Sequence, residues 1–328
     1  MKRIQISSYG PPDVLEMAEC EIPVLRDDEI LVRVQYAGIN PKDCLIRKGK
    51  FKTFTGKKFP LAIGNDFAGE VLRTGKSVVH VQAGDPVWGM LNGFRSGAYA
   101  SVLSAKPDEV GLKPASLSFA QAAATPLAAL TALQALRDLG GKNARTACIN
   151  GASGGVGTFA VQIAKAFGMD VTAICSSRSA DLCIKLGADH IIDYTATKIN
   201  ELQQPFDIFF DVFGNQSFPA ARRLLNRKGV YISTIPKLPN FLQQFITYVS
   251  PGKKAKVILF KSNENDLGVL AQMIENGSIS PVIDREYPLA EAADAHRYIE
   301  TKRAHGKVVL AIPQENTSCV DEERYSAS

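Results

Sequence analysis

The sequence has few cysteines and histidines, and neither residue type is spaced as in a metal site. Its six cysteines are scattered without a Cys-x-x-Cys pair, and its four histidines cannot be grouped at ligand spacing. A zinc site needs three or four such side chains close together, so we expect no metal. Three of the cysteines lie in apolar runs, which is typical of small core residues in a reducing compartment.

Long hydrophobic runs and a secretory signal are also absent. Residues 1–10 lack the apolar core of a signal peptide, and the longest apolar run, near 120–136, is interrupted by polar residues and Pro126. We therefore expect no membrane span and a cytoplasmic protein.

The net charge of +5 is spread along the chain, and the basic groups at 48–58 and 253–256 lack an interleaved pattern of stacking aromatics. No nucleic-acid partner is expected.

A length of 328 residues predicts two domains. The chain also divides into two parts with different sequence patterns. Residues 1–113 carry short alternating segments between glycines and prolines, which predicts an irregular antiparallel β domain. An Ala/Leu-rich helical stretch then runs from 118 to 139, and strands and helices alternate after it. The apolar strands are predicted at 145–150, 171–175, 190–192, 206–211, 229–233 and 256–260. This alternation is typical of a parallel doubly wound sheet.

The last elements are a helix at 266–275, a strand at 282–287, a helix at 289–301 and a strand at 307–312. They could return to the first domain and make it discontinuous. We therefore divide the chain into a first part (1–122), an inserted α/β domain (123–262), a returning part (263–313) and a polar tail (314–328).

A glycine-rich segment, Ile-Asn-Gly-Ala-Ser-Gly-Gly-Val-Gly at 149–157, leaves a predicted strand and enters a predicted helix. It reads as GxGxxG with alanine at the first glycine position. Small residues let the backbone turn sharply and approach a pyrophosphate, and the helix N-terminus attracts its charge. A glycine-rich turn without a ligand is the alternative, and the strand–turn–helix context favours the dinucleotide. The predicted cofactor contacts here are Ala152, Ser153, Gly154, Gly155, Val156 and Gly157.

The end of the second predicted strand indicates which nicotinamide cofactor is bound. Ser176-Ser177-Arg178 stands there, with Ser176 nineteen residues beyond Gly157. An NAD site would present an acid to the ribose hydroxyls, whereas two hydroxyls and a guanidinium suit a 2′-phosphate. The alternative is that a serine caps the next helix and Arg178 is solvated. We predict NADPH as the cofactor.

Five further segments match the sequence pattern of a known protein family. With them the chain resembles the quinone oxidoreductase branch of the medium-chain dehydrogenase/reductases, over nearly its whole length to about Ile312. The resemblance implies an α/β protein with a discontinuous GroES-like β catalytic domain and an inserted Rossmann domain with a doubly wound parallel sheet, and an active site in the cleft. The matching segments are 37–43 (AGINPKD), 46–49 (IRKG), 64–69 (GNDFAG), 187–194 (GADHIIDY) and 306–310 (GKVVL).

The resemblance also implies roles for individual residues. Asn40 and Asp43 would lie beside the nicotinamide, with Thr131 across the pocket. Asn40 could donate to a substrate oxygen and stabilise its developing charge, or it could be only a turn residue before Pro41. Zinc-dependent relatives carry a cysteine and a His-Glu pair where this chain has Asn40 and Asn65-Asp66, which implies a zinc-free site.

Four more residues are expected near the cofactor. Tyr194 would be a further 2′-phosphate contact by the same resemblance. Phe213 and Ile235 follow later strands at the carboxyl edge, where dinucleotides bind. Phe260 would line the nicotinamide pocket, with an ordinary core phenylalanine as the alternative. The family often has a tyrosine where Leu45 stands, and its loss removes a possible donor.

The predicted function is zinc-free, NADPH-dependent reduction of a small-molecule quinone. Reduction of α,β-unsaturated aldehydes or ketones requires the same machinery and stays open. A non-catalytic NADPH-binding sensor or scaffold is the alternative of another class. A homodimer is also left open.

Overall fold

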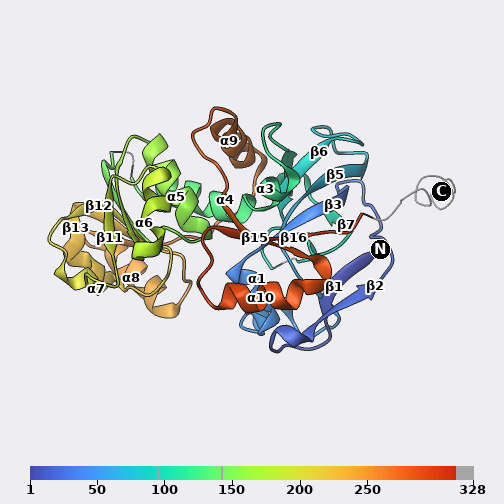
Figure 1. Ribbon diagram of the computed structural model, residues 1–328, viewed down its shortest axis with the longest axis horizontal. Coiled ribbons are helices and arrows are strands. Elements are labelled where there is room, and N and C mark those ends of the chain that lie inside the picture. Colours follow the sequence, from blue (N-terminus) through green and yellow to red (C-terminus); the bar gives the residue numbers. More distant parts are fainter. Residues whose placement is uncertain (95, 142, 315–328) are drawn as a thin grey trace.

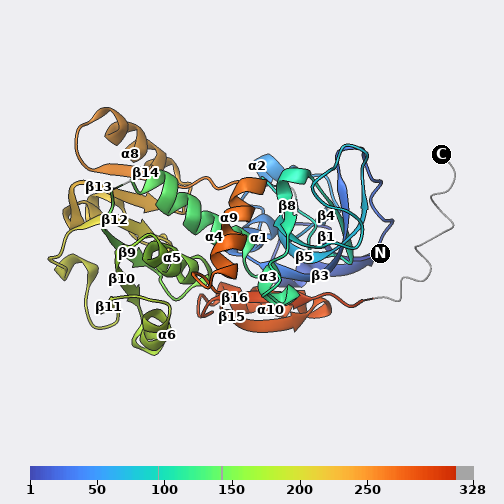
Figure 2. The same cartoon turned by 90° about the horizontal axis from the view of Figure 1, so that it is seen from above.

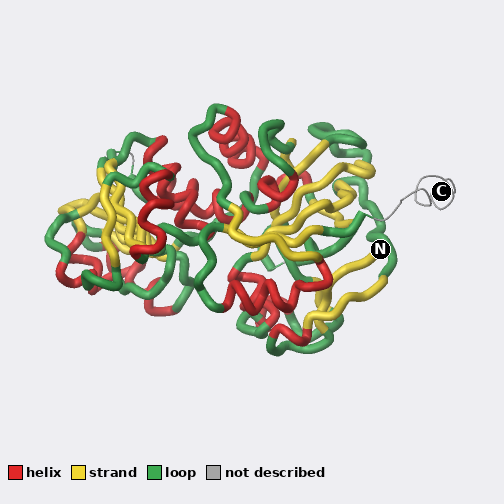
Figure 3. Tube along the Cα trace, viewed as in Figure 1, coloured by secondary structure: helices red, strands yellow, loops and turns green. Residues whose placement is uncertain are grey.

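The computed structural model describes residues 1–94, 96–141 and 143–314. Two lobes lie side by side along its long axis (Figure 1). One lobe contains a parallel sheet with helices, and the other is rich in antiparallel strands (Figure 3). Apart from Gln314, the predicted polar tail lies outside the described residues.

The parallel sheet has the strand order β11-β10-β9-β12-β13-β14. Its strands are buried in the middle, with Ala147, Cys148 and Ile149 of β9 fully inaccessible, as expected for a sheet covered on both faces. The order reverses between β9 and β12, and in such sheets ligands bind at the carboxyl ends beside that reversal. The strands are β9 (Thr146–Asn150), β10 (Asp170–Cys175), β11 (His190–Asp193), β12 (Phe206–Asp211), β13 (Leu225–Ser233) and β14 (Lys254–Val257). Their helices are α5 (Gly155–Ala166), α6 (Ala180–Lys185), α7 (Phe218–Ala221) and α8 (Leu238–Val249).

The other lobe contains a seven-stranded sheet that combines strands from the first and the last parts of the chain. Its order is β15-β16-β3-β5-β6-β8, with β7 also paired to β3. Because β16 pairs antiparallel with β3, the last segment does return to the first lobe. The strands are β3 (Ile30–Ile39), β5 (Asp66–Thr74), β6 (Pro86–Met90), β7 (Val102–Ala105), β8 (Val110–Leu112), β15 (Ile283–Pro288) and β16 (Lys307–Ala311). A small sheet beside it joins β1 (Lys2–Ile6), β2 (Leu15–Glu19) and β4 (Leu61–Ala62).

Helices fill the space between and around the lobes (Figure 2). α3 packs on β3 and β5, whereas α4 packs on α5 and α9. α4 also contacts β5 and β6, so it touches both lobes. The predicted division at residue 122 falls inside α3 and stays a prediction. The helices are α1 (Pro41–Arg47), α2 (Lys52–Thr55), α3 (Phe119–Ala123), α4 (Pro126–Gln134), α9 (Glu264–Glu275) and α10 (Ala292–Glu300). None of the described helices combines the length and apolar character of a bilayer span.

The structure corrects three expectations about elements. The single helical stretch at 118–139 is two helices, because Pro126 starts a new helix and cannot continue the old one. The strand placed at 256–260 ends at Val257, since Ile258 and Phe260 leave the sheet and pack on the core. Helix α8 was not predicted, although its segment LPNFLQQFITYV has a proline in the first turn and apolar residues at helical spacing. Most of those apolar residues face solvent.

Candidate active site

The predicted cofactor loop joins β9 to α5. Gly151 has a φ of 86°, in the left-handed region that glycine adopts without strain. A Cβ on Gly157 would lie 2.1 Å from the Gly151 carbonyl oxygen, so only glycine allows this close approach. A Cβ on Gly154, at the N-cap of α5, would meet nothing nearer than 3.5 Å. The loop therefore leaves open space at a helix N-terminus, which fits a pyrophosphate.

The residues predicted to bind a 2′-phosphate follow β10. Arg178 is exposed, and among the described residues it makes no hydrogen bond or ion pair. The Ser176 hydroxyl lies 3.2 Å from the Ser179 hydroxyl. Tyr194 is 58% exposed, and its backbone N–H donates to the Cys175 carbonyl at 3.2 Å. The fold therefore brings the backbone of Tyr194 to the carboxyl end of β10, where the Arg178 guanidinium is free of partners among the described residues.

A carboxylate that the sequence analysis did not consider lies beside these residues. Asp193, the last residue of β11, accepts bonds from the backbone N–H and hydroxyl of Thr195, at 2.8 and 2.7 Å. Bonds from Thr195 and then Ser177 lower the pKa of Asp193 below its usual value. One of its carboxylate oxygens, Oδ1, thus accepts both bonds from its own loop.

The loop after β12 is fixed by Asp211, another residue that was not predicted as part of the site. One carboxylate oxygen accepts from the Asn150 amide at 2.7 Å and from the Gly214 N–H at 2.9 Å. The other accepts from the Gln216 N–H and the Tyr231 hydroxyl. Burial raises the pKa of Asp211 despite these bonds. The Asp-x-x-Gly ending of the strand is the sequence signal that could have identified it.

Phe213 and Ile235 lie at the same carboxyl edge. A Cβ on Gly151 would be 3.0 Å from Phe213 Cβ, so this side chain stands directly against the glycine loop, 45% exposed. Ile235 packs on Gly214 in the loop that contains Phe213. Phe260 packs partly on the core and also lies 5.9 Å from the Lys42 ammonium. Phe260 thus contacts both the core and Lys42 of α1, and its place in the nicotinamide pocket stays a prediction.

Asn40 lies in the other lobe, at the N-cap of α1, and is 1% exposed. Its amide nitrogen donates to Asp66 at 3.0 Å, and its amide oxygen accepts from the Lys307 ammonium. Lys307 also donates to the Ile39 carbonyl at 3.2 Å and lies 3.5 Å from Asp66. Because an ammonium only donates and a carboxylate only accepts, these partners fix the orientation of the amide. Among the described residues the amide nitrogen donates only to Asp66, which leaves its second hydrogen for another acceptor.

Asp43 belongs to a second buried chain of polar groups. It accepts from the Asn40 backbone N–H at 2.9 Å and from the Tyr99 hydroxyl at 3.0 Å. Tyr99 in turn lies 3.3 Å from His296, whose other nitrogen lies 3.5 Å from the Cys44 sulfur. Burial, and then the charge of Asp66, raise the pKa of Asp43 to about 6. Burial lowers the pKa of His296 to about 3.

Thr131 lies on α4 and is connected to the same region through the helix. Its hydroxyl donates to the Leu127 carbonyl at 2.7 Å, so toward a ligand it could act only as an acceptor. The Leu127 N–H at the start of this helix donates to Asp66 at 2.9 Å. Of the three residues predicted to be catalytic, Asn40 and Asp43 therefore contact each other directly in a buried network. The Thr131 hydroxyl bonds within its own helix, and among the described residues it makes no bond to that network.

The segment before β16 connects the two lobes, which the sequence gave no reason to expect. The Gly306 N–H donates to the Ser153 carbonyl at 2.9 Å, within the glycine loop. His305 lies 3.5 Å from the Ser179 hydroxyl, and the Lys302 ammonium lies 5.1 Å from the Phe213 ring. The cofactor loops of one lobe are thus in contact with the strand that carries Lys307.

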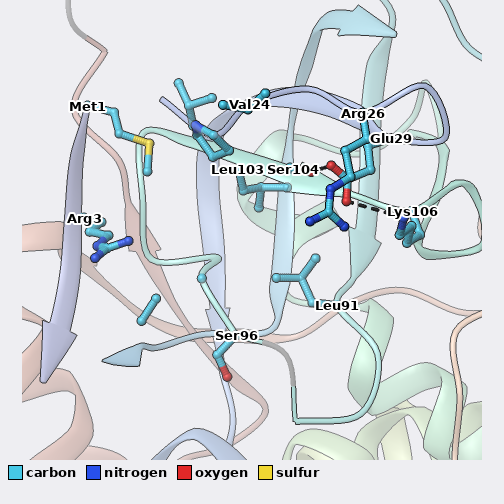
Figure 4. A pocket seen from close by; sticks show the side chains of 14 residues that line it. Met1, Arg3, Val24, Arg26, Glu29, Leu91, Ser96, Leu103, Ser104 and Lys106 are labelled. Atoms are coloured by element: carbon cyan, nitrogen blue, oxygen red, sulfur yellow. Dashed lines mark hydrogen bonds and ion pairs between the residues drawn. The ribbon is translucent and has the colours of Figure 1, made fainter. Parts of the chain in front are cut away.

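A separate pocket lies on the strand-rich lobe, away from these groups (Figure 4). It is lined by residues of β1, β7 and neighbouring loops, among them Arg3, Arg26 and Lys106. None of the predicted site residues lines it. It is therefore not the cavity in which the glycine loop and Asn40 would meet a shared ligand.

Comparison with known proteins agrees with this arrangement. Residues 26–132 match the family described as "Alcohol dehydrogenase GroES-like domain", and residues 186–310 match "Zinc-binding dehydrogenase". The mouse mitochondrial NAD(P)H oxidoreductase RTN4IP1 is 33% identical, across 94% of this chain and 88% of that protein. The tomato 2-methylene-furan-3-one reductase is 35% identical, across 94% and 79%.

A solved structure gives the same result for the whole fold. The quinone oxidoreductase from Coxiella burnetii superposes with a TM-score of 0.88 at 32% identity, covering 95% of this chain and 99% of that one. This supports an NAD(P)H-dependent oxidoreductase with a GroES-like domain and a Rossmann-like domain. The chain belongs to the medium-chain dehydrogenase/reductase superfamily, in its quinone oxidoreductase branch.

Proposed function

We propose that this protein reduces quinones with NADPH, without a catalytic metal. The observation that carries the proposal is the buried ammonium of Lys307 between Asn40 and Asp66. A site that holds a cation of its own has no room for a Lewis acid that polarises an alcohol. It suits substrates already activated by conjugation, which accept a hydride at an electron-poor carbon.

A zinc ion does not fit the residues present, although one matched family is named for zinc. Asn40 and Asp66 use their inward atoms on each other and on Lys307. Zinc sites in proteins use thiolate, imidazole and carboxylate ligands, and an ammonium among the ligands would repel a divalent ion. Within the described part of the chain, no three side chains of His, Cys, Asp or Glu form a metal-binding group.

NADPH fits the nucleotide-binding residues better than NADH. The free Arg178 guanidinium, with Ser176 and Ser177 beside it, can form charge-assisted bonds to a 2′-phosphate. Asp193, nearby, already accepts two bonds from Thr195 through one of its carboxylate oxygens. The open space at Gly154 would receive the pyrophosphate.

The residues of the cleft would then support hydride transfer. NADPH, when bound, supplies the hydride. The free amide hydrogen of Asn40 would donate to the substrate oxygen and stabilise the negative charge that develops there. Thr131 could accept a bond from a ligand, and Asp43 would hold the backbone of Asn40 in place.

Reduction of enones is the second candidate, favoured by the similarity to a plant furanone reductase. A non-catalytic sensor is the third. A steady-state panel of quinones and enals with NADPH separates the three. Turnover of quinones supports the proposal, and turnover of enals alone supports the second. Tight NADPH binding without any turnover would leave the sensor.

Metal content gives an independent test of the zinc-free proposal. We expect the purified protein to contain far less than one zinc per chain by elemental analysis. Activity should survive prolonged chelation with EDTA. Stoichiometric zinc whose removal abolishes turnover would overturn the proposal.

We also propose a homodimer in a reducing compartment such as the cytoplasm. The five described cysteines are all free, and four of them are buried. Among the described residues β14 pairs only with β13, and the adjacent α8 exposes a row of large apolar side chains, which is typical of an association surface. These are Leu238, Leu242, Phe245, Ile246, Tyr248 and Val249.

A further inference from the structure

Lys307 links the two halves of the site, although no sequence argument gave it a role. Its backbone follows Gly306, which bonds to the glycine loop, and its side-chain stem passes within 2.9 Å of the position a Cβ on Gly155 would take. Its ammonium ends in the other half of the site, on the oxygen of Asn40. One side chain thus passes from the cofactor loop to the proposed substrate-binding amide.

The geometry determines what this ammonium does to Asn40. A cation bonded to an amide oxygen draws electron density from the nitrogen and makes its N–H groups stronger donors. One of those hydrogens is held by Asp66 at 3.0 Å, which leaves the second as the polarised one. The surroundings are dry, since Lys307 is 3% exposed and Asp66 fully buried, so the effect is not screened by water.

We propose that Lys307 is a positioning residue, which orients and polarises the Asn40 amide so that its free hydrogen binds the substrate oxygen. This inference rests on the proposed function for its catalytic consequence. Lys307 itself touches no substrate and contributes through Asn40 alone. Asp66 completes the arrangement by neutralising the ammonium and holding the other amide hydrogen.

The kinetic test is a double-mutant cycle with Lys307→Met, Asn40→Ala and the combined variant. Lys307→Met should lower kcat by roughly ten- to a hundredfold, less than the about 10²–10³ that loss of an oxyanion donor can cost. Because Lys307 works through Asn40, the combined variant should be no slower than Asn40→Ala alone. Additive losses would overturn the proposal, and so would an unchanged kcat.

Removing the ammonium alone leaves the Asp66 charge buried and unpaired, so the single variant could unfold. The variant Lys307→Met/Asp66→Asn removes both charges and is the fallback. It should bind NADPH within about twofold of the wild type by fluorescence, yet show the same loss of kcat. A parallel loss of NADPH affinity would mean that Lys307 serves the cofactor, and full kcat would mean that it serves only the fold.

A spectroscopic readout keeps the test independent of turnover. In protein labelled with ¹⁵N-asparagine, the Asn40 side-chain signals are those that vanish in Asn40→Ala. They should be sharp and slow to exchange in the wild type, and broadened or shifted in Lys307→Met/Asp66→Asn. Unchanged signals would refute the positioning role. If this result holds and no quinone or enone turns over, only the proposed function fails.

Discussion

At the residue scale, Arg178 decides between the two nicotinamide cofactors. It is exposed and without a partner among the described residues, so it is available to a phosphate at no structural cost. Arg178→Ala should weaken NADPH binding by about 1.5–3 kcal/mol, the range for a hydrogen bond to a charged group, and leave NADH nearly unchanged. Fluorescence titration with both cofactors measures this, with Arg145→Ala as the matched surface control. Equal losses for both cofactors would refute the 2′-phosphate assignment.

Two buried residues, Asp43 and His296, have pKa values shifted in opposite directions, and both shifts affect how the stability of the fold depends on pH. Asp43 has its pKa raised from 3.8 to about 6, so it stabilises the fold below pH 4 and loses that contribution as the pH rises to 6. His296 has its pKa lowered from 6.5 to about 3, so it stabilises the fold above pH 6.5 and loses that contribution as the pH falls. Between about pH 4 and 6 the two slopes oppose each other and largely cancel.

Asp43→Asn should therefore expose the titration of His296. Its free energy of unfolding should fall by about 1.4 kcal/mol per pH unit below pH 6, more steeply than in the wild type. The amide oxygen can still accept from Tyr99, so the variant keeps its packing. Urea unfolding at several pH values between 4 and 7 measures the slope, with Asp181→Asn as a surface control. Parallel curves for variant and wild type would contradict the opposing pair.

At the element scale, two glycines where β9 leads into α5 have different roles. Gly154 leaves space for the cofactor, and Gly157 allows the close backbone approach that the fold requires. A Cβ on Gly154 fits the protein, since its nearest neighbour would lie at 3.5 Å, but it occupies the space proposed for the pyrophosphate. Gly154→Ala should weaken NADPH and NADH alike, by tenfold or more, which is about 1.4 kcal/mol. The thermal midpoint should stay the same or rise slightly.

The neighbouring glycine provides the contrast. Gly157→Ala puts a methyl group 2.1 Å from the Gly151 oxygen, so it should lower the thermal midpoint before any ligand is added. Calorimetry and cofactor titration on both variants test the distinction. An unaltered affinity in Gly154→Ala would remove the pyrophosphate from this loop.

At the scale of the whole molecule, α8 and β14 lie along one edge of the parallel-sheet lobe (Figure 2). Phe245 is 70% exposed in the middle of the apolar row, and burial of such side chains drives association. We expect the wild type to be a dimer by light scattering and Phe245→Asp to be a folded monomer. Val79→Asp, at a site 93% exposed in the other lobe, is the control. A wild-type monomer at micromolar concentrations would refute the proposed assembly.

The sequence by itself determined the α/β architecture, the strand–turn–helix of the cofactor loop and the Ser-Ser-Arg ending of β10. These features are local, because periodicity and glycine placement act within a few residues of one another. We did not predict α8 from it, although the apolar residues of this helix recur at helical spacing; only the structure shows that most of them face solvent.

Only the tertiary structure decided what surrounds Asn40. Lys307 is separated from it by 267 residues and His296 from Tyr99 by 197, and no local pattern specifies such contacts. The pKa values of Asp43 and His296 follow from the same folding step, because burial among distant elements removes the water that would stabilise their charged forms. The sequence motifs thus indicated the groups that can bind a dinucleotide. Long-range packing decided which buried side chains around Asn40 are joined by hydrogen bonds and ion pairs.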